Sequence, residues 1–173
     1  MEIVAHCVAN ALFYSKQIRS RTVIHIVLDG PGDPPKTLRF ESETLGTLEG
    51  SDERGICSVI KTLLGEGQGL SLGQEKEVDH GLFVSKKGFE PLVKEKCACS
   101  VPYLLKPDGT DIRTISFDAH PVFVFSDHLA MPKKSDKYLQ RLGLQSMSVG
   151  PKTLFASQCI VLAHNELDRQ GVA

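Results

Sequence analysis

The sequence has almost no excess charge and no long apolar run, and both shortages exclude classes of function. Twenty Lys and Arg residues stand against 21 Asp and Glu residues, for a formal net charge of −1, so the chain as a whole is not built to bind a polyanion. Any nucleic-acid surface must be a local patch. No segment approaches the ~20 apolar residues of a membrane-spanning helix, and the first residues lack the basic start and cleavage site of a signal peptide. We therefore expect no membrane association.

The cysteines and glycines also lack the patterns of well-known sites. Five scattered cysteines are an odd number, which indicates a reducing, cytoplasmic compartment more than a disulfide framework. Cys97 and Cys99 have no second Cys/His pair at zinc-ligand spacing, so we interpret them as thiols at a helix end and expect no metal. The glycine-rich segment 65–73 has no strand before it and no Lys-Ser/Thr pair after it, so we interpret it as a flexible connector and not a phosphate-binding loop.

The remaining composition is that of an ordinary globular protein, with 41% hydrophobic and 24% charged residues, and 173 residues suit a single domain over 1–173. Periodicity and turn residues predict the elements of the first two thirds. The expected helices cover 3–15, 51–65 (with Ser51 as the N-cap) and 89–97. The expected strands cover 23–28 (apolar enough to be buried on both faces), 37–40, 82–84 and 101–105, with a turn at 106–109.

The stretch 122–167 organises the chain. An apolar strand at 122–125, an amphipathic segment at 133–142, a second strand before the Gly150-Pro151 turn and a helix over 155–167 make an α/β rhythm. In open α/β sheets, ligands bind beyond the carboxyl ends of the strands. We therefore predict an α/β fold with its functional site after these two strands.

Residue chemistry favours a ligand pocket formed by Leu104, Ser126 and 149–154. Leu104 and Val149 could sandwich a flat ring, Ser126 is small and exposes backbone, and Gly150 lets the main chain approach a ligand closely. Backbone N–H groups in the turn before the last helix could bind adenine edges or a carboxylate. The alternative is ordinary core packing around a turn.

Other candidate groups carry weaker signals. Cys159 and His164 are five residues apart on a helix and poorly placed as a nucleophile and base, so a buried or ligand-touching thiol is the favoured interpretation of Cys159. His164 and Asp168 are four apart, a spacing that commonly stabilises a helix surface. Asp127, with His128, follows a strand end and is better placed for chemistry, although an Asp there can also cap the next turn.

The final third resembles the SPOUT, or α/β-knot, methyltransferases, and within them the bacterial branch of the tRNA pseudouridine N1-methyltransferase (TrmY-like) family. The carrying segments are Ser126-Asp127-His128-Leu129-Ala130-Met131-Pro132-Lys133-Lys134-Ser135, Arg141-Leu142-Gly143, Ser148-Val149-Gly150-Pro151-Lys152-Thr153-Leu154-Phe155-Ala156-Ser157-Gln158-Cys159 and His164-Asn165-Glu166-Leu167-Asp168. Weaker matches lie at 6–13, Arg39-Phe40 and 81–84, so the resemblance covers essentially the whole chain.

The resemblance implies a SPOUT-type open sheet whose C-terminal segment forms a deep trefoil knot, a rare feature among folds. It also implies a homodimer that binds S-adenosylmethionine (SAM) in the knot and methylates RNA, with tRNA as the favoured substrate. No metal is needed, because the sulfonium of SAM already activates the methyl group. Carried over by position, the cofactor-binding residues are Leu104, Ser126, Val149, Gly150, Pro151, Lys152, Thr153, Leu154 and Cys159.

Two departures from the family pattern stand out. Archaeal members usually have glycine where Ser126 stands, and family members tend to have an extra strand and loop before the segment that begins at Ile3. We interpret Asp127 as the candidate catalytic base for N1 of pseudouridine. Arg19 and Arg21 are candidate RNA phosphate contacts, and the alternative for both is an ordinary solvated arginine of a turn. The alternatives are a SAM-dependent methyltransferase for another acceptor, and a non-catalytic SAM- or RNA-binding remnant of the family.

Overall fold

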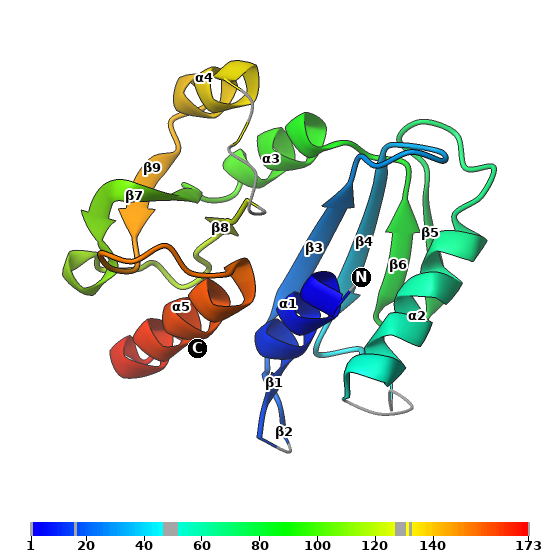
Figure 1. Cartoon of the computed structure of the whole chain (residues 1–173), viewed down its shortest axis with the longest axis horizontal. Coiled ribbons are helices and arrows are strands. Elements are labelled where there is room, and N and C mark those ends of the chain that lie inside the picture. The colour runs from blue at the N-terminus through cyan, green and yellow to red at the C-terminus, as the bar shows by residue number, and fades with distance from the viewer. Residues whose placement is uncertain (1, 16, 47–51, 127–130, 132, 173) are drawn as a thin grey trace. The chain divides into compact units, whose positions relative to one another are not determined.

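The computed structural model describes residues 2–15, 17–46, 52–126, 131 and 133–172, with only the backbone of Lys133. The chain divides into two compact units, residues 1–91 and 92–173, which are considered one at a time (Figure 1). The single domain predicted above stays a prediction. None of the helices in the described part of the chain is long and apolar enough to cross a membrane.

The first unit is an antiparallel sheet with two helices. Its elements are α1 (Glu2–Leu12), β1 (Phe13–Tyr14), β2 (Gln17–Ile18), β3 (Val23–Leu28), β4 (Lys36–Glu41), α2 (Glu53–Glu66), β5 (Glu75–Asp79) and β6 (Leu82–Ser85). The sheet has the order β3-β4-β6-β5, and β1 pairs with β2 in a separate hairpin. Every neighbouring pair of strands is antiparallel.

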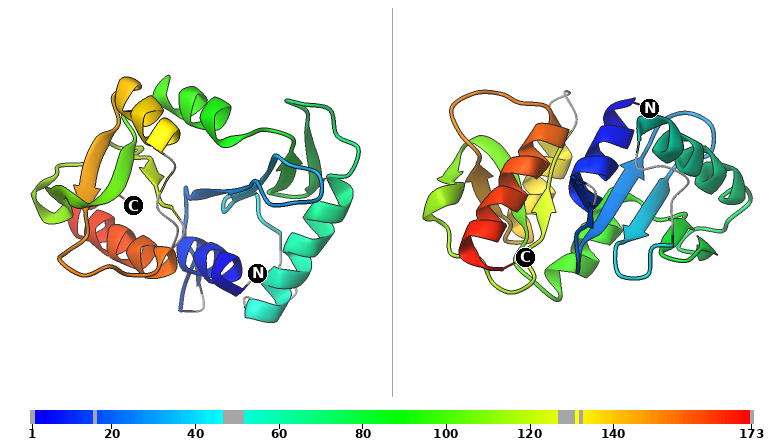
Figure 2. Two further views of the ribbon diagram at one scale, coloured as in Figure 1. Left: turned by 45° about the horizontal axis from the view of Figure 1, so that its top comes forward. Right: turned by 90° about the horizontal axis from the view of Figure 1, so that it is seen from below.

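Helices α1 and α2 contribute to one core on one face of this sheet (Figures 1 and 2). Strand alternation turns Leu38 and Phe40 of β4 toward that face, where both are fully buried. The core also takes three side chains from each helix and two from β6: Ala5, Val8, Leu12, Ile56, Ile60, Leu63, Leu82 and Val84. Asp52 begins α2 as its N-cap, because its side chain accepts a hydrogen bond from the Gly55 N–H at 2.9 Å.

The structure corrects several predicted boundaries in this unit. Helix α1 ends at Leu12 and not at residue 15, because Phe13–Tyr14 turns back to pair with β2. Asp52 caps α2 in the role predicted for Ser51, which lies outside the described residues, and the helix passes the predicted stop at 65 to end at Glu66. Strand β3 is an edge strand that is only half-buried. Strand β5 was missed, because its charged residues give no apolar alternation.

The second unit is a small parallel sheet with a long helix on it. Helix α3 (Phe89–Cys97) leads into β7 (Tyr103–Asp111), the 3₁₀ turn η1 (Ile112–Thr114), β8 (Phe123–Val124), α4 (Lys133–Arg141), β9 (Gln145–Ser148) and α5 (Ala156–Gln170). The sheet order is β8-β7-β9, and both pairs are parallel. This arrangement confirms the α/β rhythm predicted for the C-terminal third.

Helix α5 lies against this sheet in both views of Figure 2. Its Ala163 and Leu167 pack with Tyr103 of β7 and Met147 of β9. Rings from β7, β8 and the loop between them add an edge-to-face cluster, in which the Tyr103 and Phe117 centroids are 5.1 Å apart. The core therefore fixes β7, β9 and α5 as one rigid support. The trefoil knot stays a prediction.

The turn predicted at 106–109 lies within β7 and forms an excursion from the sheet. Leu105 and Thr110 both stand opposite Met147, so the four residues between them leave the ladder and return. Gly109 sits on the Met147 backbone, where an added Cβ would meet the Met147 nitrogen and carbonyl carbon at 2.5 Å. Only glycine fits this contact, and the strand predicted at 101–105 continues beyond it to Asp111.

Candidate functional site

The strand register brings the predicted pocket residues to one edge of the parallel sheet. Leu104 of the central strand stands opposite Val124 of β8 and Ser146 of β9. Ser126 and Val149 follow those partners by two and three residues, so they leave the sheet at the same carboxyl edge. Ser126 is exposed, Val149 is half-buried against the core, and Leu104 is 4% exposed. The ring sandwich between Leu104 and Val149 stays a prediction.

The turn after β9 is held in shape by a side chain and leaves space above a glycine. The Ser148 hydroxyl accepts a hydrogen bond from the Gly150 N–H at 3.3 Å and donates one to the Gly150 carbonyl at 3.2 Å. Gly150 has a φ of +140°, which side-chain-bearing residues rarely adopt. Apart from Gly150 itself and its two chain neighbours, no described residue has an atom within 4 Å of a Cβ built on it. The backbone here is thus open to a ligand that comes close to the main chain.

The rest of the predicted segment joins this turn to helix α5. Pro151, Lys152, Thr153 and Leu154 are all exposed. The buried Cys159 lies behind them, and its sulfur donates to the Leu154 carbonyl at 4.0 Å. Burial raises the pKa of the Cys159 thiol, so it stays neutral at physiological pH. That state suits the predicted buried or ligand-touching thiol and not a nucleophile.

A cavity of about 210 Å³ lies against this turn. Its lining combines two segments, one from the β7 excursion onward and one from the end of β9: Pro107, Gly109, Asp111, Arg113, Ser148, Gly150 and Pro151. Gly150 and Pro151 belong to the predicted set, whereas the 107–113 side was missed. The sequence showed the Pro-Asp-Gly turn signal at 107–109. Only the structure shows that the chain returns onto Met147, which places this turn beside the end of β9.

An ion pair supplies the charge of this cavity. The Asp111 carboxylate accepts hydrogen bonds from the Arg113 side chain at 3.1 Å (Nε) and 2.7 Å (Nη2), and from its backbone N–H at 3.0 Å. These bonds, the side-chain ones first, lower the pKa of Asp111 to about 2 and raise that of Arg113. Lys106 lies 2.6 Å from an oxygen of Asp136 on α4, so its charge is already balanced.

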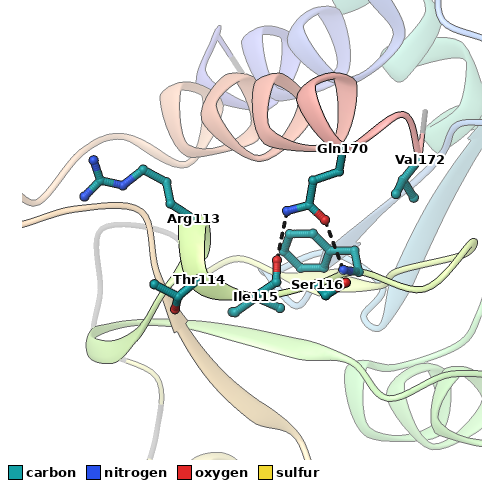
Figure 3. A pocket seen from close by; sticks show the side chains of 7 residues that line it. Arg113, Thr114, Ile115, Ser116, Gln170 and Val172 are labelled. Atoms are coloured by element: carbon teal, nitrogen blue, oxygen red, sulfur yellow. Dashed lines mark hydrogen bonds between the residues drawn. The ribbon is translucent and has the colours of Figure 1, made fainter.

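A larger cavity of about 430 Å³ borders the other side of Arg113 (Figure 3). It is lined by Arg113, Thr114, Ile115, Ser116, Phe117, Gln170 and Val172, and none of these described residues was predicted for the cofactor. Gln170 reaches from α5 to donate to the Ile115 carbonyl at 2.8 Å and to accept from the Phe117 N–H at 3.1 Å. These bonds attach the last turn of α5 to the segment after η1.

The remaining predicted residues lie elsewhere or cannot be placed. Asp127 lies outside the described residues, so its catalytic role stays a prediction. Arg19 and Arg21 belong to the first unit, near the β1–β2 hairpin. The Arg19 guanidinium lies 5.1 Å from the centre of the Tyr14 ring, and Arg21 is exposed with a φ of +52°. The described residues contain no group of three or more His, Cys, Asp or Glu that could hold a metal ion.

The C-terminal edge fits a cofactor with an apolar part and a charged part. It offers an open backbone at Gly150, a neutral buried thiol behind the turn, and a charged pair beside it. A strand-end site that combines main-chain approach with a few polar groups is the common form of a small-molecule site in an α/β sheet.

Comparison with known proteins gives the family directly. A family model described as "Putative SAM-dependent RNA methyltransferase" matches residues 1–172. Relatives named "Putative pseudouridine methyltransferase" include those of Shewanella frigidimarina (41% identical over 167 residues), Photobacterium profundum (40% over 167) and Vibrio cholerae (37% over 169). The alignments cover 96%, 96% and 98% of this chain, and 84% of each relative.

A solved structure supports the fold. The crystal structure of Archaeoglobus fulgidus Nep1 bound to S-adenosylhomocysteine aligns with a TM-score of 0.62 at 13% identity, and the alignment covers 99% of this chain and 71% of that chain. At this identity the likeness concerns the fold alone, and it bears out the predicted fold class.

Proposed function

We propose, from the premise that this chain belongs to the family of SAM-dependent RNA methyltransferases, that it methylates N1 of a pseudouridine in RNA. The family model matches residues 1–172. Pseudouridine is the substrate named for relatives up to 41% identical to this chain. The observation that carries the proposal is the open Gly150 turn at the carboxyl edge of the parallel sheet. A turn held by Ser148 gives a cofactor a fixed main-chain surface to bind.

The cofactor would be held by the nine residues predicted for it, those of the strand ends and of the turn before α5. Ser148 keeps the turn at Gly150 in one conformation, and Cys159 ties the segment to the first turn of α5. When SAM is bound it supplies a methyl group activated by a sulfonium. The task of the protein is then to hold the nucleobase nitrogen in line with that methyl, which is positioning catalysis.

A base must also take the proton of N1, because protonated N1 is a weak nucleophile. We propose Asp127, which comes three residues after β8 in the sequence, as the group that accepts it. Methyl transfer would then form the N1–carbon bond, break the sulfur–carbon bond and leave the N1 proton on the carboxylate. Asp127→Asn keeps the size of the side chain and removes its basicity, so it should lower the rate of transfer and leave the SAM affinity unchanged.

We propose that the RNA is a tRNA and that the first unit binds part of it. Arg21 is exposed and Arg19 stacks on Tyr14, and guanidinium groups suit phosphate oxygens. The near-neutral net charge agrees with a local RNA patch. If each arginine binds a phosphate, Arg21→Gln should reduce the slope of log affinity against log salt by about one contact. An unchanged slope would remove Arg21 from the RNA surface.

We also propose a homodimer, which would be cytoplasmic like its RNA substrate. Helix α5 and the residue before it expose apolar side chains: Phe155 is 64% exposed, Val161 47% and Leu162 39%. Exposed large apolar side chains at the start and middle of one helix are typical of an interaction surface. Light scattering should report a dimer for the parent and a monomer for Leu162→Glu. A stable monomeric parent at micromolar concentration contradicts this proposal.

A transfer assay separates the proposed function from its alternatives. The parent is incubated with SAM carrying a labelled methyl group and with paired RNAs that differ only in pseudouridine or uridine at one position. Label in the pseudouridine RNA alone supports the proposal. Label only in another acceptor supports a different methyltransferase, and absence of label with intact SAM binding supports a non-catalytic family member.

Two variants at one position test the cofactor site itself. Gly150→Trp should fill the space above the turn and abolish SAM binding in calorimetric titration. Because any side chain is strained at a φ of +140°, Gly150→Ala is the matched control with the same strain and little bulk. SAM binding by the alanine variant and not by the tryptophan variant supports the site. Equal binding by both folded variants contradicts it.

A further inference from the structure

We propose that Asp111 and Arg113 bind the amino-acid end of SAM in the cavity of about 210 Å³ beside Gly150. Asp111 would accept a hydrogen bond from the α-ammonium group, and Arg113 would donate to the α-carboxylate. Neither residue is among those predicted for the cofactor. The inference rests on the proposed function, since it needs SAM to be the ligand of the Gly150 turn.

The size of the cavity agrees with this part of the cofactor. At about 210 Å³ the cavity is smaller than the ~300–1,000 Å³ of pockets that hold a whole drug-sized ligand. It can therefore take one arm of SAM, and the adenosine part is left to the other predicted residues.

The hydrogen-bonding capacity of the pair also matches an amino acid. An ionised carboxylate has about four acceptor sites and a guanidinium has five N–H donors. Asp111 uses three of its acceptor sites on Arg113, and two of the guanidinium donors are used in return. About one acceptor and three donors are left over. That remainder is complementary to one ammonium proton and two carboxylate oxygens.

Asp111 and Arg113 are the charged residues among those that line the cavity. Lys106, on the same excursion, is paired with Asp136 of α4. Arg113 is 74% exposed at its side chain, and in Figure 3 its guanidinium points away from Gln170. The guanidinium is held by Asp111 through Nε and Nη2, and its remaining N–H donors can bind a ligand carboxylate without breaking those bonds. The low pKa of Asp111 keeps it anionic at every pH where the protein would work.

S-adenosylhomocysteine and 5′-methylthioadenosine are both neutral at sulfur and differ only in the amino-acid end. SAM and these two ligands are titrated calorimetrically into the parent, Asp111→Asn and Arg113→Gln. Asparagine keeps the side-chain oxygen that caps η1, so the local fold is retained. Arg169→Gln, an exposed arginine of α5 outside the cavity lining, is the matched control for loss of one positive charge.

We expect each cavity variant to weaken SAM and S-adenosylhomocysteine about 5- to 10-fold, a range reduced from that of buried charged hydrogen bonds because the pair is exposed. Methylthioadenosine affinity should change by less than about twofold, and Arg169→Gln should affect none of the ligands. Equal weakening of all the ligands, or no weakening of SAM, overturns the inference while the proposed function stands. A folded parent that binds no SAM overturns both.

Discussion

Replacing Gly109 by alanine should destabilise the edge that carries the site, because this glycine lies directly against the Met147 backbone. A Cβ at this position would lie 2.5 Å from both the nitrogen and the carbonyl carbon of Met147 and 2.7 Å from its Cα, against 3.4 Å or more in ordinary contact. The two chains would have to separate by roughly 1 Å, and Met147 is fully buried and paired with β7 on both sides of the excursion.

The expected cost follows from the rigidity of this contact. Overpacking a well-packed interior costs about 1–3 kcal/mol, and the upper half of that range applies because all three close atoms are backbone. For a chain of this length each kcal/mol moves the unfolding temperature by ~2–4 °C. Gly109→Ala should therefore lower the unfolding temperature by roughly 4–12 °C, and it should weaken SAM binding as well because Gly109 lines the cavity.

The assay is thermal unfolding followed by circular dichroism, with Gly65→Ala as the control for the same chemical change. Gly65 lies in helix α2, and beyond its chain neighbours and the helix's own backbone no described atom lies within 4 Å of an added Cβ. Alanine there should stabilise the protein by about 0.5–1 kcal/mol through helix propensity. A Gly109→Ala protein that unfolds within 1 °C of the parent would refute the reasoning about the excursion.

Three further predictions follow from single contacts. Gln170→Leu leaves two backbone groups of segment 115–117 without their bonds to α5 and should cost about 1–3 kcal/mol in denaturant unfolding; unchanged stability would contradict it. A thiol reagent followed by mass spectrometry should label exposed Cys99 before buried Cys159, whose pKa is raised by burial; equal rates would contradict this. The pKa of Asp111 is lowered from 3.8 to about 2, so its stabilising contribution is complete above pH 3.8 and lost as pH falls to about 2. Unfolding temperatures of the parent and Asp111→Asn should converge over that range, and a constant difference would contradict the assignment.

The sequence by itself determined the kind of fold at the C-terminal end and the turn at the centre of the site. Apolar runs followed by polar turns predicted the strand ends, and helix periodicity predicted α5 within a few residues. Gly150 followed from its place after a strand. These features depend on neighbours along the chain, which is why local patterns were enough to find them. The residue motifs of 126–159 also identified the family that the comparisons support.

Only the tertiary structure decided which segments meet at that site. The Pro-Asp-Gly signal predicted a turn at 106–109, but a turn signal does not say where the chain returns. Its return onto Met147 places Asp111 and Arg113 beside Gly150, some 40 residues away in the chain. For the same reason the sequence did not predict β5. Its charged residues form a strand at the sheet edge because their backbone pairs with β6. Pairings of this kind depend on backbone hydrogen bonds and close approach between distant segments, and no local pattern records them.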